Sequence, residues 1–238
     1  MLDSDEQHWW YRGRRRVLRA ALDRLPLPAD PRLLDAGCGS GRTLDLLSDY
    51  GRTSGVDLSG QAVDTARRRG HPDVQVAAVE HLPYADGAFD VVTCLDVIEH
   101  TRDDHATLSE LFRVTAPGGF LVVTVPAYQA LWSWHDEVNL HFRRYDRWSL
   151  RAAATAAGWE LERDTYFNGL LLLPAATVRL AQRRRRAHPR SDLALTPPAL
   201  NGVLELPLRL ESRLVAFGAR IPAGLSLLAI LRRPPATR

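Results

Sequence analysis

Three short stretches of this sequence combine residue types that could bind a nucleoside and move a proton. Asp35–Gly41 reads DAGCGSG, Asp57 follows Thr53–Val56, and Asp96–His100 reads DVIEH. Glycines lack a Cβ, so a ligand can lie against their backbone, and one carboxylate can accept hydrogen bonds from both hydroxyls of a ribose. A histidine beside carboxylates can act as a general base near neutral pH. The residues therefore predict a nucleoside site next to a proton-accepting group.

The spacing of the glycines indicates which class of ligand the loop could bind. Gly37, Gly39 and Gly41 give G-x-G-x-G, and Arg42 stands where a dinucleotide fingerprint has its third glycine. Because the fingerprint needs that glycine for close packing of its helix on its strand, the spacing does not match a dinucleotide site and favours a nucleoside without phosphate. A plain strand-to-helix turn is the alternative, which Asp57 at the end of the next strand disfavours.

The elements that must position these stretches alternate along the chain. Apolar runs and turn residues predict strands at 32–36, 53–57, 74–79, 89–95, 120–125, 159–166 and 225–231. Helical spacing predicts helices at 43–47, 62–69, 103–114 and 149–157, with a tight turn at 117–119. This order predicts an α/β fold with a mostly parallel sheet and helices on both faces. Ligands of such sheets bind at the carboxyl ends of the strands, where all three stretches fall.

Composition limits the class of protein. The 238 residues are 45% hydrophobic, with 31 basic and 28 acidic residues and a net charge of +3. These values predict one globular domain with no disulfide framework, since only Cys38 and Cys94 occur. We also expect no signal peptide, no membrane span and a cytoplasmic location. Every basic residue is arginine, which excludes lysine chemistry; the runs at 12–19 and 183–186 are expected to be solvated helix faces.

Seven motifs in order resemble a known family. They are Leu34–Gly41, Gly55–Ser59, Leu82–Tyr84, Gly87–Asp90, Asp96–His100, Leu111–Val114 and Pro117–Gly119. Between Leu33 and Val125 the chain resembles the class I S-adenosylmethionine-dependent methyltransferases. The resemblance implies a Rossmann-like seven-stranded sheet whose last strand is antiparallel. It also implies S-adenosylmethionine as cofactor and S-adenosylhomocysteine as product.

The resemblance also implies which residues hold the cofactor. Asp35 and the glycine loop would hold the methionine part, Asp57 the ribose, and residues 78–80 the adenine edge. The implied cofactor-binding residues are Asp35, Gly37, Cys38, Gly39, Gly41, Asp57, Leu58, Ala78, Val79, Glu80 and Leu95. Ala78 departs from the family, which often has an acidic side chain there, so Glu80 or a backbone carbonyl would have to replace that contact.

The stretch after the fourth expected strand supplies the candidate catalytic groups. We predict His100 as general base with Glu99 orienting it, although the same pair could instead fix the geometry of its loop. The segment also resembles ubiquinone-type O-methyltransferases and small-RNA 2′-O-methyltransferases. That likeness suggests a divalent metal on Asp96, Glu99 and His100, with His135 or His141 as a fourth ligand. We do not favour the metal, because Asp96 is shorter than the residue in those families.

Two aromatic and basic segments, 8–16 and 128–145, are expected to flank the cofactor cleft and bind the acceptor. The predicted acceptor-binding residues are Trp10, Tyr11, Arg14, Trp132, His135, His141 and Arg144. Residues 1–30 form a helical lid segment in this interpretation, and 31–238 the methyltransferase domain with an insertion at about 168–220. A lid that packs its aromatic rings on the sheet edge is the alternative.

The predicted activity is methylation of a small molecule, on a hydroxyl or carboxyl oxygen, in a bacterial secondary-metabolite or lipid-linked pathway. Two alternatives stay open: a protein of this fold that binds S-adenosylmethionine without transferring methyl, as a cyclase or a structural user, and a nucleic-acid methyltransferase. The low net charge and the absence of a recognisable RNA-binding module disfavour nucleic acid. We expect a monomer or homodimer, with at most weak peripheral contact to membranes.

Overall fold

The structure is a computed structural model that describes residues 9–174, 176–177 and 201–236. The arginine run 183–186 and the Pro-rich stretch 189–198 lie outside the described residues. The chain divides into two compact units. We call residues 26–125, 147–164 and 228–238 the sheet unit, and residues 1–25, 126–146 and 165–227 the helical unit.

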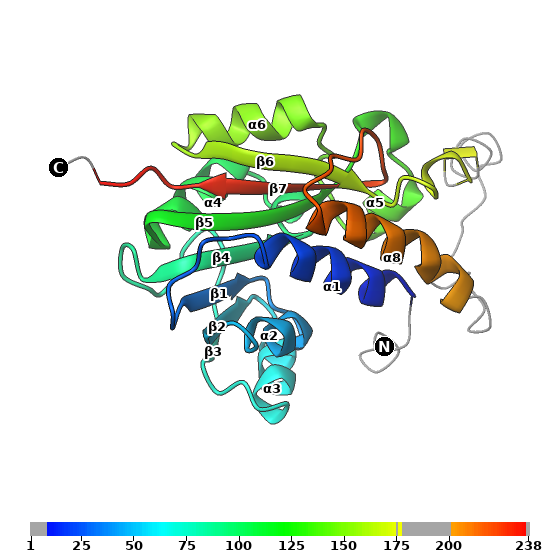
Figure 1. Cartoon of the computed structure of the whole chain (residues 1–238). Coiled ribbons are helices and arrows are strands. Elements are labelled where there is room, and N and C mark those ends of the chain that lie inside the picture. The colour runs from blue at the N-terminus through cyan, green and yellow to red at the C-terminus, as the bar shows by residue number, and fades with distance from the viewer. Residues whose placement is uncertain (1–8, 175, 178–200, 237–238) are drawn as a thin grey trace. The chain divides into compact units, whose positions relative to one another are not determined.

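One seven-stranded sheet runs in the order β3-β2-β1-β4-β5-β7-β6 (Figure 1). Its strands are β1 (Arg32–Ala36), β2 (Arg52–Asp57), β3 (Val74–Val76), β4 (Phe89–Leu95), β5 (Thr115–Pro126), β6 (Glu160–Phe167) and β7 (Ser226–Arg232). Strands β1 to β5 pair in parallel. Strand β7 is antiparallel to β5, since Gly118 bonds Arg233 at one end and Ala127 bonds Leu225 at the other. The predicted fold class, with an antiparallel last strand, is confirmed.

Helices follow most strands, as the alternating pattern predicts. They are α1 (Trp9–Leu22), α2 (Arg42–Leu47), α3 (Gly60–Arg68), α4 (Asp104–Val114), α5 (Trp134–Val138), α6 (Arg147–Ala156) and α8 (Asn201–Ala216), with short 3₁₀ turns at Ile98–His100 and Gln129–Leu131. Side-chain caps begin two of them: Ser59 accepts from the Ala62 N–H at 3.3 Å and Asp103 from the Ala106 N–H at 2.9 Å. These caps satisfy N–H groups that have no partner within the helix.

The middle of the sheet is the core of the sheet unit. Every residue of β4 except Asp90 is buried, because a parallel strand covered on both faces has no solvent side. The core continues to α4, where the buried Trp159 ring nitrogen donates to the Leu108 carbonyl at 3.0 Å. The predicted bounds 89–95 match this strand residue for residue.

Strand β5 differs from the prediction. We expected a turn at 117–119 and a strand only from 120, whereas β5 begins at Thr115. Phe89 pairs with Thr115, but Val91 pairs with Phe120. Strand β5 therefore has more residues between these two pairs than β4 has, and the register shifts there. Gly118, with a φ of 82°, donates to the Arg233 carbonyl, and Arg233 donates back to Gly119. The Pro-Gly-Gly stretch therefore forms an irregularity within the strand.

In the helical unit, α1 lies beside α8 (Figure 1). Gly13 permits the close approach, because a Cβ there would meet Leu208 Cδ1 at 2.1 Å. The buried Glu205 of α8 accepts from Arg16 at 3.0 Å and pairs with Arg12 at 3.1 Å. One carboxylate thus fixes two arginines of the predicted lid helix.

Among the described residues, no helix is long and apolar enough to cross a membrane.

Candidate active site

The loop between β1 and α2 turns on three glycines with left-handed backbone. The φ angles are 85° at Gly37, 53° at Gly39 and 85° at Gly41, a region that residues with a Cβ adopt at a cost. A Cβ at Gly37 would lie 2.4 Å from Val97 Cγ2, whereas one at Gly39 would meet no atom within 4 Å. The loop therefore needs glycine at 37 for packing and leaves open space beside Gly39.

Asp57, at the end of β2, ties that loop to the next one. Its Oδ2 accepts from the Gly39 N–H at 2.8 Å and its Oδ1 from the Ser59 N–H at 2.9 Å. An ionised carboxylate offers about four lone-pair positions, so each oxygen can still accept a hydroxyl. Leu58 next to it is 76% exposed, a large apolar surface that a flat ring could cover. The open space, the carboxylate and the apolar side chain fit a nucleoside.

Two predicted cofactor residues near the loop are buried. Asp35 accepts from the Thr93 hydroxyl at 2.6 Å, which links β1 to β4. Burial, with the charges of Asp35 and Asp57 added, raises the pKa of Cys38 far above its usual value. The neutral thiol is therefore the favoured form of Cys38.

The predicted adenine edge, residues 78–80, follows β3. Val79 is buried, while Ala78 and Glu80 are partly exposed. The backbone there is tied to β2, since the Ala77 N–H donates to the Asp57 carbonyl at 3.1 Å.

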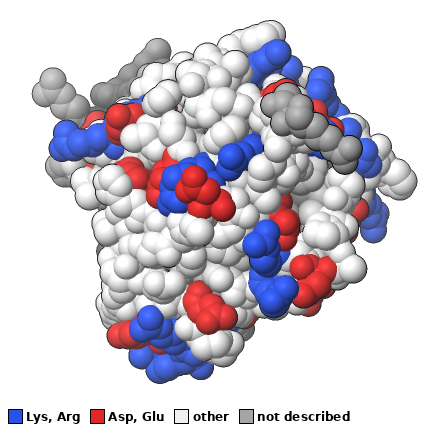
Figure 2. Space-filling view, turned by 90° about the vertical axis from the view of Figure 1, so that its left-hand side faces the viewer, with Lys and Arg blue, Asp and Glu red and all other residues white. Residues whose placement is uncertain are grey.

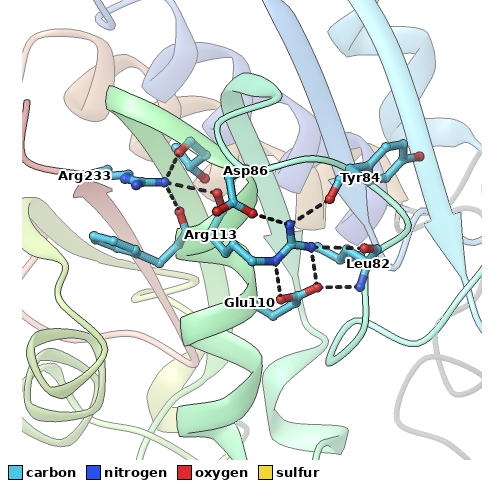
Figure 3. Close-up of polar contacts among 8 residues, drawn as sticks. Leu82, Tyr84, Asp86, Glu110, Arg113 and Arg233 are labelled. Carbon is cyan, nitrogen blue, oxygen red and sulfur yellow. Dashed lines mark hydrogen bonds and ion pairs between the residues drawn. The ribbon is translucent and has the colours of Figure 1, made fainter. Parts of the chain in front are cut away.

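The loop that continues from this edge is held by Arg113 of α4 (Figure 3). Its guanidinium donates to the carbonyl of Tyr84 at 2.7 Å and that of Leu82 at 3.1 Å. It also pairs with Asp86 and Glu110, each at 2.7 Å, and the hydrogen bonds from Arg113 lower the pKa of Glu110. Arg113 is therefore a positioning residue, which the sequence analysis used only as part of a motif.

The residues after β4 form a tight turn. Asp96 has a φ of 57°, and its N–H donates to the Thr124 carbonyl at 2.9 Å. Leu95 and Glu99 are buried, whereas His100 is exposed. The Thr101 hydroxyl closes the turn on the Ile98 carbonyl at 2.9 Å. His100 is thus reachable by a substrate, and its role as base, with Glu99 orienting it, stays a prediction.

All seven predicted acceptor-binding residues lie in the helical unit. On α1, the Trp10 and Tyr11 rings meet edge to face at 5.0 Å, and the Arg14 guanidinium lies 5.0 Å over the Trp10 ring. The His135 and His141 rings meet edge to face at 6.2 Å. Trp132 is partly exposed.

Arg144 and His141 converge on a buried carboxylate, Asp136. Its Oδ1 lies 2.7 Å from Arg144 Nε and 2.9 Å from His141 Nδ1, and its Oδ2 accepts from Arg144 Nη2 at 2.9 Å. Burial opposes ionisation of Asp136, but the hydrogen bonds from His141 and Arg144 hold its pKa well below its usual range. The guanidinium of Arg144 is therefore engaged within the unit, and its predicted contact with an acceptor stays a prediction.

Asp136 has no role in the predictions made from the sequence. Its signal was the spacing Ser133-x-x-Asp136, a capping box in which the Ser133 N–H donates to Asp136 Oδ2 at 2.8 Å. That pattern predicts the start of α5. The contact with Arg144 depends instead on the path of the loop that follows α5, which the pattern does not indicate.

Comparison with known proteins gives one domain match. The methyltransferase domain family matches residues 34–123, which include the glycine loop, Asp57 and His100. A Mycolicibacterium smegmatis protein named as a probable S-adenosylmethionine-dependent methyltransferase is 33% identical over 162 residues, 66% of this chain and 62% of that protein.

A second curated relative and one solved structure extend the comparison. The ubiquinone biosynthesis O-methyltransferase of Thiobacillus denitrificans is 34% identical over 111 residues, 44% of this chain and 47% of the enzyme. The chain spans about half the length of the curated relatives it matches. The partner of the Trm112 methyltransferase activator in a complex from Haloferax volcanii has the same fold, with a TM-score of 0.65 over 97% of this chain and 92% of that one, at 22% identity.

Proposed function

We propose that this chain, which belongs to the class I S-adenosylmethionine-dependent methyltransferases, transfers a methyl group to an oxygen atom of a small molecule. The observation that carries the proposal is the pairing of Gly39 with Asp57 at the carboxyl ends of β1 and β2, within the matched domain. This pairing leaves open space and hydrogen-bond acceptors for a nucleoside.

The cofactor residues have distinct tasks in this proposal. Asp57 binds the ribose hydroxyls, Leu58 covers one face of the adenine, and Gly39 lets the chain of the ligand pass close to the backbone. When bound, S-adenosylmethionine supplies a methyl group on a positively charged sulfur. Asp35, fixed by Thr93, supports the loop that holds the methionine part.

Transfer to a hydroxyl oxygen requires a proton acceptor, whereas a carboxylate needs none. The cofactor, held by Asp57 and the glycine loop, would supply the methyl group, and His100 would take the proton of the acceptor hydroxyl. The exposed position of His100 supports this role, because a base must reach the substrate. A neutral amine would need no such base, so the residue favours oxygen as the atom methylated.

The acceptor class is inferred from the helical unit and the relatives. Trp10, Tyr11 and Trp132 offer aromatic surface suited to a flat or isoprenoid compound, and Arg14 adds a cation for an acidic group. A ubiquinone biosynthesis O-methyltransferase among the relatives supports oxygen as the atom methylated.

Two arginines of the sheet unit are paired with carboxylates, which weakens them as sites for nucleic acid. Figure 2 shows one face, at the amino ends of the parallel strands, on which basic and acidic side chains lie next to one another. Arg32 pairs with Asp90 at 3.3 Å and Arg69 with Asp45 at 2.6 Å. Arginines neutralised in this way contribute little to binding a phosphate backbone.

The test is incubation with methyl-labelled S-adenosylmethionine and a panel of phenols, hydroquinones and carboxylic acids, followed by mass spectrometry. We expect S-adenosylhomocysteine together with a product heavier by one methyl group on oxygen. A reaction that consumes an acceptor while S-adenosylmethionine persists would instead support the cyclase alternative. Cofactor binding without turnover of any of these compounds would contradict the proposed acceptor classes.

A further inference from the structure

Helix α8 of the helical unit exposes a continuous apolar stripe. Leu206 is 63% exposed, Leu210 52%, Leu214 40% and Phe217, just beyond the last helical residue, 86%. Steps of four, four and three residues bring these side chains to one side of a helix with 3.6 residues per turn. Four large apolar side chains on one exposed stripe mark an interaction surface rather than scattered surface residues.

The other sides of α8 already have partners. Leu208 is buried against Gly13 of α1, and Glu205 binds the α1 arginines. Glu211 accepts from the backbone N–H groups of Asn168 at 2.6 Å and Gly169 at 2.9 Å. The helix is therefore anchored on its buried sides, and the stripe is not the face that folds the unit.

The charges beside the stripe have one sign. Arg213 is exposed on α8 next to Leu214, and Arg220 is exposed beyond the end of the helix. Arg209 is also exposed, but its guanidinium pairs with Glu205 at 3.2 Å. The acidic residues of α8, Glu205 and Glu211, are both buried. The outward side of the helix thus combines apolar and cationic groups, the pattern of helices that lie in the interface of an anionic membrane.

We propose that the exposed side of α8 binds an anionic lipid surface. The leucines and Phe217 would enter the boundary between headgroups and acyl chains, while Arg213 contacts the lipid phosphates. A second copy of this chain fits less well, because an antiparallel two-fold pairing through the stripe sets the arginine flank of one copy against that of the other. The proposal stands independently of the methyl-transfer activity.

The experiment is sedimentation of the full chain with vesicles of phosphatidylcholine alone or mixed with phosphatidylglycerol. We expect binding to the mixed vesicles that falls as salt rises. The triple variant Leu210→Gln, Leu214→Gln, Phe217→Gln should bind at least about tenfold more weakly, since apolar contact is lost while the fold is kept. Circular dichroism and the thermal midpoint check that the variant folds.

Matched variants assign the effect to α8. Leu210→Gln should weaken binding, whereas Leu140→Gln, the same change at a residue of the helical unit that is 75% exposed, should not. Arg213→Gln should reduce the preference for phosphatidylglycerol. The proposal is overturned if neither vesicle binds, if both bind alike, or if Leu140→Gln matches Leu210→Gln. It is also overturned if the wild-type protein does not bind vesicles and light scattering shows that it forms a dimer which the triple variant abolishes.

Discussion

In the sheet unit the candidate cofactor residues are held by backbone hydrogen bonds at strand ends, whereas in the helical unit charged side chains hold one another. Asp57 accepts from two backbone N–H groups and keeps acceptor capacity for a ligand. Asp136 accepts from Arg144 and His141 and lies fully buried, and Glu205 is surrounded by arginines in the same way. Asp57 thus keeps acceptor positions for a ligand, whereas Asp136 and Glu205 are taken up by contacts within their own unit.

This difference separates two kinds of mutational effect. When a carboxylate that accepts hydrogen bonds from backbone N–H groups is removed, the expected effect is a change in ligand affinity. The freed N–H groups can donate to water or to neighbouring acceptors instead. A carboxylate buried among cations leaves an uncompensated charge when either partner is removed. The following changes test this contrast, beginning with the largest expected effect.

Arg144→Met should destabilise the helical unit strongly. The variant leaves Asp136 buried with only His141 and Ser133 as partners, and breaking such a pair costs about 3–5 kcal/mol. Urea unfolding measures the loss. Arg52→Met is the matched control, because Arg52 and its partner Asp30 are exposed and such a pair contributes only about 0–1 kcal/mol. Equal losses in the two variants would contradict the contrast.

Lowering the pH should reveal how much the Asp136 carboxylate contributes to stability. The pKa of Asp136 is lower in the folded chain than the value of about 3.9 expected when unfolded. A depressed pKa contributes stability that is present above about pH 4 and lost as pH falls toward the folded pKa. Urea midpoints from pH 7 to pH 2 should therefore fall more steeply in the wild type than in Asp136→Asn. Parallel curves would show that Asp136 is not the group responsible.

The sheet unit was predictable because its signals are local. The run 89–95 and the loop of Gly37, Gly39 and Gly41 each predict their structure within a few residues, and the resemblance adds the order of the motifs. The shortening of the third strand to Val74–Val76 and the irregularity in β5 depend on pairing with a neighbour, which no local pattern reports.

The helical unit was less predictable because its contacts join distant residues. Arg16 and Glu205 are 189 positions apart, and nothing in either segment indicates the other. The aromatic segment at 128–145 looks like a ligand surface in composition, yet Arg144 is engaged with Asp136 inside the unit. Composition shows which side chains are present. Only the tertiary fold determines whether such a side chain binds another residue of the chain or a ligand.

His100→Ala should lower turnover by about a hundredfold or more while cofactor affinity changes little, since a base acts in the transition state. His105→Ala is the control, because His105 lies on α4 and contacts the Ala156 carbonyl. Single-turnover rates and calorimetry with S-adenosylhomocysteine separate the two effects. If EDTA abolishes activity and Mg²⁺ restores it, the metal alternative replaces the simple base.

Asp57→Ala should weaken binding of S-adenosylhomocysteine by at least about 1.5 kcal/mol, roughly tenfold, through the loss of charge-assisted hydrogen bonds to the ribose. Calorimetry measures the affinity, and the thermal midpoint shows whether the Gly39 and Ser59 contacts matter for folding. Asp64→Ala, which removes an exposed carboxylate of α3, should leave affinity unchanged. A folded Asp57→Ala protein with wild-type affinity would remove Asp57 from the cofactor site.

The smallest expected effect lies at Trp132. If this side chain contacts the acceptor, Trp132→Ala removes binding that is equal in the ground and transition states. The acceptor KM should then rise about three- to tenfold while kcat is kept and cofactor affinity stays within about threefold. Trp134→Ala, two residues along and 42% exposed, removes the same ring from a position with no predicted acceptor contact. Because both indoles belong to one segment, a general loosening of the helical unit should affect the two variants alike. A KM change in both variants, together with a lower urea midpoint, would assign Trp132 to the packing of that segment rather than to the acceptor site.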